Sequence, residues 1–131
     1  MRLFISFIII VLIWSCASGK TAKLTSDPEK FIKEISDNNF NGAKVQTLYN
    51  KSGDLVVIFH KIERGVGFPY VVEFVVADVK NKNILYTDSV IDGDVFWLND
   101  DIIRIKRVPE VRSTNENENV KSKDINIRKL M

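Results

Sequence analysis

Carboxylates are the most numerous side chains in this sequence that could do chemistry, and five of them lie close together in it. They are Asp88, Asp92, Asp94, Asp100 and Asp101. Calcium takes several oxygen ligands, and a glycosidase needs two carboxyl groups at a set separation. The Asp92-Gly93-Asp94 run lacks the longer loop and the terminal Glu of an EF-hand, and Asp is a common turn former. We therefore expect these residues to shape turns, and we predict no metal site and no catalytic residue.

The only histidine, His60, is a poor match for a general base. Catalysis by an activated nucleophile needs that nucleophile and an orienting acid within reach, and no Gly-x-Ser-x-Gly context is present. A strand here places His60 on one face with Val56, Ile58 and Ile62, so we predict a structural role at the edge of the core. One His and one Cys are also too few nitrogen and sulfur ligands for an ordinary zinc site. We predict no cofactor.

The segment 63–69, which reads ERGVGFP, is the most distinctive predicted loop. Loops that a sheet positions often carry binding residues. Arg64 offers a rigid fork of donors to a carboxylate or phosphate, and Phe68 offers apolar area. In the alternative, the segment is a wide hairpin connection whose glycines take positive φ and whose Phe68 folds back onto the core. We take Arg64 and Phe68 as the candidate partner-binding residues.

The first sixteen residues have the layout of an export signal. Arg2 precedes an apolar run, residues 3–14, that is shorter than the ~20 residues of a membrane-spanning helix. The run closes on Ile13-Trp14-Ser15-Cys16, which resembles the bacterial lipobox, in which an aliphatic, a variable and a small residue precede the lipidated cysteine. Trp14 is larger than the residue usual at its position. The resemblance covers this signal alone and names no family for the rest of the chain.

The resemblance implies cleavage before Cys16 and a diacylglycerol on its sulfur, with a further acyl chain in many bacteria. Two or more acyl chains anchor a protein stably. Lipidation also accounts for a lone cysteine, which cannot form an internal disulfide in an exported chain. Two alternatives remain open: release of a soluble protein that starts at Ser18, and retention of the segment as a short anchor. Because Ala17 differs from the Asp retention signal of enteric bacteria, we expect the periplasmic face of an outer membrane.

Composition restricts the partners and the domain count. The 19 Lys and Arg stand against 17 Asp and Glu, and removal of residues 1–15 takes away only Arg2. Such a nearly neutral chain does not predict the clustered basic face of a nucleic-acid binder, and we exclude that class. We predict a polar tether over residues 16–25 and a single small β-rich domain over 26–131.

A short helix is predicted at the start of this domain. Ser26 or Asp27 can cap its N-terminus, and Pro28 suits its first position. Phe31, Ile32 and Ile35 then share one face, and the polar run 36–39 ends the pattern. A helix this short needs tertiary packing, so we expect it to dock on a sheet.

The rest of the domain has the periodicity of strands. We predict strands over 44–50, 55–62, 70–79, 84–91, 95–98 and 101–108. Residues 113–131 are predicted as a polar link with a last edge strand around Ile125 and Ile127. The strand 70–79 is apolar on both faces and is expected to be central, and Asn99-Asp100 is predicted as a two-residue hairpin turn. Short connections predict a mostly β fold: an antiparallel meander sheet of about six or seven strands, sandwich- or barrel-like, with one short N-terminal helix.

These features predict a non-catalytic lipoprotein of the cell envelope that binds another envelope protein or a polymer. An inhibitor or immunity-type lipoprotein against a hydrolase is an alternative, with loop 63–69 as its plug. An enzyme that acts on envelope glycans through the Asp-rich turns is the alternative from another class. That enzyme would need two carboxyl groups that face one cleft.

Overall fold

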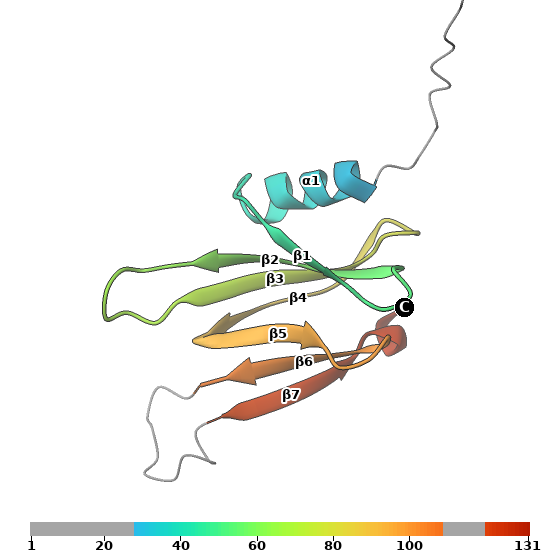
Figure 1. The fold of residues 1–131 in the computed structure, drawn as a ribbon. Coiled ribbons are helices and arrows are strands. Elements are labelled where there is room, and N and C mark those ends of the chain that lie inside the picture. Colours follow the sequence, from blue (N-terminus) through green and yellow to red (C-terminus); the bar gives the residue numbers. More distant parts are fainter. Residues whose placement is uncertain (1–27, 109–119) are drawn as a thin grey trace, which may run out of the picture.

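The computed structural model describes residues 28–108 and 120–131, which form three layers (Figure 1). The first layer is one helix, α1 (Pro28–Asn39). The second, sheet A, contains β1 (Gln46–Tyr49), β2 (Leu55–Ile62), β3 (Val71–Asp78) and β4 (Asn83–Ile91). The third, sheet B, contains β5 (Gly93–Trp97), β6 (Ile102–Arg107) and β7 (Lys121–Asn126), and the 3-10 helix η2 (Ile127–Leu130) follows it. All strand pairs are antiparallel between neighbours in sequence, which confirms a mostly β, antiparallel fold.

The prediction of one continuous meander sheet is wrong, because the strands divide into two sheets after β4. The described strands do not close into a barrel either. At the division Asp92 takes a positive φ of 50°. A Cβ on Gly93 would overlap the carbonyl oxygen of Lys106 and the side chain of Val90. Glycine at this position lets the chain pass directly from one sheet to the other.

Strand β3 is central, as its apolar pattern predicts. Val72, Phe74 and Val76 belong to the core between the two sheets. Val75 and Ala77 alternate with them and lie in the core under α1. Because β3 is buried on both faces, it needs a layer on each side.

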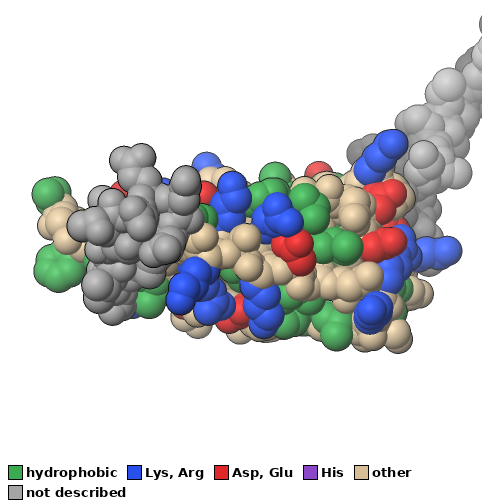
Figure 2. Space-filling model, turned by 90° about the horizontal axis from the view of Figure 1, so that it is seen from below, with side chains coloured by type: hydrophobic (Ala, Val, Ile, Leu, Met, Phe, Trp, Pro, Cys, Tyr) green, Lys and Arg blue, Asp and Glu red, His purple; other side chains and the backbone are tan. Residues whose placement is uncertain are grey.

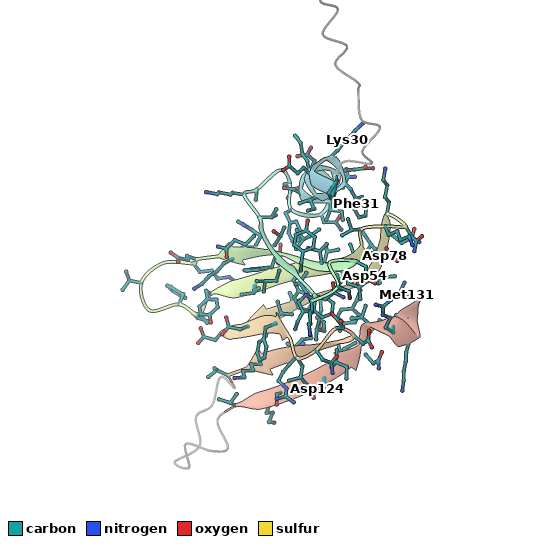
Figure 3. All side chains as sticks on the ribbon, turned by 45° about the vertical axis from the view of Figure 1, so that its right-hand side comes forward. Lys30, Phe31, Asp54, Asp78, Asp124 and Met131 are labelled. Atoms are coloured by element: carbon teal, nitrogen blue, oxygen red, sulfur yellow. The ribbon has the colours of Figure 1, made fainter. Side chains whose placement is uncertain are left out.

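Helix α1 supplies one of these layers and begins at Pro28, as predicted. Phe31 and Ile35 are buried against sheet A, and Figure 3 shows Phe31 directed from the helix toward the sheet. The backbone N–H groups of Phe40 and Gly42 both donate to the Ser36 carbonyl, at 3.0 Å each, which ends the helix. The predicted capping residues, 26 and 27, lie outside the described residues.

The connection between β5 and β6 is longer than the predicted two-residue turn. Strand β5 ends at Trp97 and β6 begins at Ile102. The Asn99 side-chain oxygen accepts from the N–H groups of Asp101 and Ile102, at 2.9 Å each. The Asn99 amide therefore satisfies two donors of a wider turn, a role that short side chains of this kind often take.

The predicted last edge strand is present as β7, in which Ile125 pairs with Ile103 of β6. Ile127 does not continue this strand. It starts η2 and is fully buried in the core between the sheets. Residues 113–119 of the predicted polar link lie outside the described residues.

The outer face of sheet B carries Lys and Arg side chains together with acids (Figure 2). Arg104 makes a two-pronged ion pair with Asp124, at 2.7 and 2.8 Å. The Lys106 ammonium lies 5.2 Å from the centre of the Phe96 ring. These contacts cover the outer face of a sheet whose other face is apolar.

A hydrogen-bond network, which we call the clasp, joins three distant segments at one end of the sandwich. The buried Asn50 side chain donates to the Asp54 carboxylate (2.7 Å) and to the Asp100 carbonyl (3.0 Å). Arg128 of η2 bridges Asp54 (2.8 Å) and Asp101 (2.7 Å). Asp54 lies close to the C-terminal end of the chain in Figure 3. The clasp therefore ties the β1–β2 turn to the β5–β6 turn and to the C-terminus.

Truncation of Phe74 tests whether β3 carries the core. We expect Phe74→Ala to lower the free energy of unfolding by about 3–5 kcal/mol, the usual loss for a buried aromatic. Urea unfolding of the purified protein measures this change. Val66→Ala is the control, because Val66 is fully exposed and surface changes stay within about 0.5 kcal/mol. An unfolding midpoint that barely moves in Phe74→Ala would contradict the assignment.

Acid unfolding tests the clasp. The Asn50 amide above all, and then Ser52 and Arg128, hold the pKa of Asp54 below its usual value of 3.8, against the opposing effect of burial. A depressed pKa stabilises the fold at pH values above the unfolded pKa, and this stabilisation is lost as pH falls through the folded pKa. We therefore expect Asp54→Asn to have a lower Tm than the wild type at neutral pH, and the Tm difference to shrink as the pH falls below 3.8, the usual pKa of the carboxyl group. A Tm difference that is constant down to pH 2 would contradict this.

Candidate functional site

The loop between β2 and β3 projects from the end of sheet A that lies away from the start of α1 (Figure 1). Gly65 and Gly67 both take positive φ, at 107° and 85°. The Phe68 N–H donates to the Gly65 carbonyl at 3.3 Å, which closes a turn. Val66, between the two glycines, is fully exposed. The glycines therefore shape a turn that directs an apolar residue into solvent.

The structure places both predicted binding residues on the surface of this loop. The Phe68 side chain is 68% exposed, so the alternative in which it folds back onto the core is wrong. Arg64 is exposed, and no side chain among the described residues forms an ion pair or hydrogen bond with its guanidinium. Arg64 and Phe68 both line a hollow of about 330 Å³ at the base of the loop.

Contacts of Tyr70 fix the base of this hollow. The Lys61 ammonium lies 3.9 Å from the centre of the Tyr70 ring, a cation–π contact. The Tyr70 carbonyl accepts from the Asp92 N–H at 2.9 Å, which fixes the loop to the junction between the sheets. Burial, followed by the charges of Asp94 and Asp92, raises the pKa of the Tyr70 phenol. The phenol is therefore neutral at physiological pH and is available as a hydrogen-bond donor.

The five clustered aspartates do not converge on one cleft. Asp94 lies near the start of β5 and Asp100 lies beyond its end, so the length of the strand separates them. Asp92 and Asp94 both lie near the Tyr70 phenol, at the junction between the sheets. Asp88 accepts from Tyr86 (3.0 Å) and Arg107 (3.1 Å), and Asp101 belongs to the clasp. Asp100 accepts from the Ser52 N–H at 2.9 Å. Three of the five carboxylates thus have partners within the fold. The prediction that these residues shape turns is wrong for Asp88 and Asp94, which lie within β4 and β5.

His60 lies at the edge of the core under α1, as its strand position predicts. Its Nδ1 is 3.1 Å from the Lys44 carbonyl oxygen, and its ring meets Phe40 edge-on at 6.4 Å between centroids. Over residues 28–108 and 120–131, no group of three or more His, Cys, Asp or Glu is placed to hold a metal ion.

Sequence reasoning missed a second site, which we call the Glu73 hollow. It has a volume of about 360 Å³ and lies where the end of α1 meets β3 and β4. Glu73, Thr87, Ser89, Asn39 and Phe40 line it. The available signal was the position of Glu73, a charged residue between Val72 and Phe74 in a strand that is apolar on both faces.

Cys16 and the rest of the predicted signal lie outside the described residues. In the part of the chain that the structure describes, no helix has the length and apolar character needed to span a membrane. Comparison of the chain with protein-family models, with curated proteins and with solved structures finds no match.

Proposed function

We propose that this protein is a lipid-anchored, non-catalytic binding module of the cell envelope, and that loop 63–69 contacts its partner. The observation that carries this proposal is the exposure of Phe68 and Val66 on a loop whose base is fixed. Large apolar side chains held in solvent gain free energy when a partner covers them. The neighbouring Arg64 adds a charged group without a partner among the described residues, which suits an acidic group on another envelope protein or on a polymer.

The arrangement of the acids favours a binding role over the glycan-acting alternative. A glycosidase holds its two carboxyl groups on either side of one bond, about 5–10 Å apart. Here Asp94 and Asp100 lie at opposite ends of β5, and Asp88 is engaged by Arg107. The projecting loop also suits the inhibitor or immunity-type alternative, in which it would enter the cleft of a hydrolase.

The position of the loop is compatible with a membrane anchor at Cys16. Helix α1 begins at the far end of the molecule from the loop (Figure 1). The chain from Cys16 to Pro28 can extend over roughly 40 Å. An anchor at Cys16 would therefore leave loop 63–69 free to face the periplasm, where we place the protein, with the outer membrane as the expected site.

Replacement of Cys16 tests the anchor. We expect Cys16→Ala to abolish incorporation of labelled palmitate and to leave the protein unprocessed or soluble. The lipid bonds to sulfur, which alanine lacks. Ser18→Ala is the matched control and should be labelled like the wild type. Equal labelling of Cys16→Ala would remove the lipoprotein assignment.

A double variant tests the loop. Because both side chains face solvent, Arg64→Ala with Phe68→Ala should keep the wild-type Tm to within about 2 °C, the shift of a near-neutral surface change. The same variant should recover at least about tenfold less of the partner that co-purifies with the wild type from native membranes, since a lost hot spot costs about 2 kcal/mol or more and about 1.4 kcal/mol is tenfold in affinity.

Tyr49→Ala with Leu98→Ala is the control for this experiment. Both of these side chains are exposed and apolar, and they lie near the clasp at the other end of the molecule. The control should recover the same partner in wild-type amount. Equal recovery by the loop variant at unchanged Tm would exclude the loop as the contact surface.

A further inference from the structure

We propose that the Glu73 hollow is a binding site for a primary ammonium group. The site lies on the α1 side of sheet A and is separate from loop 63–69. It is thus independent of the contact surface proposed above.

The first argument is the position of the charge. Glu73 is half-buried on a central strand, and its neighbours on the same face, Val71 and Val75, are buried. Among the residues that the structure describes, none forms an ion pair or hydrogen bond with its carboxylate. His60 of β2 is the direct cross-strand neighbour of Glu73, but its Nδ1 lies 3.1 Å from the Lys44 carbonyl oxygen, and no ion pair or hydrogen bond joins it to the carboxylate. The Glu73 carboxylate is therefore able to accept hydrogen bonds from a cationic ligand.

The second argument is the set of acceptors beside the carboxylate. Ser89 is the direct cross-strand partner of Glu73 in β4, and Thr87 pairs with Val75 one step along the same face. Cross-strand side chains of this kind have Cβ atoms about 5 Å apart. One carboxylate and two hydroxyl groups therefore present oxygens to the same hollow. An ammonium group has three N–H donors and no acceptor, and this set of oxygens can receive all three.

The third argument concerns the walls. Phe40 lines the hollow, and an aromatic ring favours both a cation and the alkyl chain that carries it. Asn39 adds a further amide oxygen from the end of α1. Within residues 28–108 and 120–131, no Lys or Arg lines the hollow. The other acid there, Asp88, is bound to Tyr86 and Arg107, so Glu73 sets the charge of the site.

These groups do not suit the other common cation, a divalent metal. Calcium is held by six to eight oxygens, usually from several carboxylates, whereas one free carboxylate lines this hollow. The volume of about 360 Å³ is at the lower end of ligand pockets and accepts an alkylamine or a single lysine side chain.

The test is a titration of the full purified chain with n-butylammonium chloride at neutral pH, followed by two-dimensional NMR of the backbone amides. We expect saturable shifts centred on Glu73, Thr87 and Ser89. Glu73→Gln, which keeps the shape and removes the charge, should weaken binding at least tenfold, and Ser89→Ala should weaken it several-fold. Glu63→Gln is the matched control, because it removes an exposed acid elsewhere and should bind like the wild type. The neutral analogue 1-butanol should produce no saturable shift.

Two further probes separate the sources of the ammonium group. Binding of Nα-acetyl-lysine methylamide would identify a lysine side chain as a ligand. Binding of butylammonium but not of the lysine derivative would identify a free amine, and either result supports the site.

Three results would overturn the proposal. The first is equal affinity of Glu73→Gln and the wild type for butylammonium, or the absence of saturation. The second is a calcium chloride titration that produces the same shifts at lower concentration, which would assign the hollow to a metal ion. The third is a large fall in the Tm of Glu73→Gln, which would assign the carboxylate to the fold.

Discussion

The burial of β3 on both faces is the constraint on which the rest of this structure depends. A strand that is apolar on both faces needs a layer on each side of its sheet. Without that layer, its apolar side chains would be exposed to water and the free energy gained by their burial would be lost. Helix α1 supplies one layer and sheet B supplies the other. The division of the meander after β4 follows from this requirement, since one flat sheet would leave Val72, Phe74 and Val76 in water.

The two ends of the sandwich differ, because one is tied by hydrogen bonds and ion pairs and the other carries the loop that we propose as the contact surface. At one end the clasp uses Asn50, Asp54 and Arg128 to join the turns of both sheets to the C-terminus. Asn50 Oδ1 also accepts from the Leu55 N–H at 3.0 Å, so both the nitrogen and the oxygen of the Asn50 amide are hydrogen-bonded. At the other end the long loop 63–69 carries exposed apolar residues above a fixed base. A rigid scaffold with one projecting loop is a common basis for recognition.

Charged side chains also differ in whether they form ion pairs within the fold. Several acids have partners within the fold: Asp88 pairs with Arg107, Asp124 with Arg104, and Asp54 with Arg128. Arg64 and Glu73 are charged side chains that form no such pair among the described residues, and both line hollows. An unpaired charge beside apolar surface favours a ligand of opposite sign. The loop therefore suits an acidic partner, whereas the Glu73 hollow suits a cation.

The sequence by itself determined the local elements, because periodicity and capping act over a few neighbouring residues. Pro28 started the helix, alternation identified the strands, and the two-faced apolar pattern of 70–79 identified the central strand. Only the tertiary structure decided how these elements combine. The close approach of Gly93 to Lys106 divides the sheet, Ile127 fills the core instead of extending β7, and Phe68 stays in solvent. The first two outcomes depend on contacts between residues distant in sequence. The Glu73 hollow does too, since it joins the end of α1 to β3 and β4, and the sequence showed only a charged residue within an apolar strand.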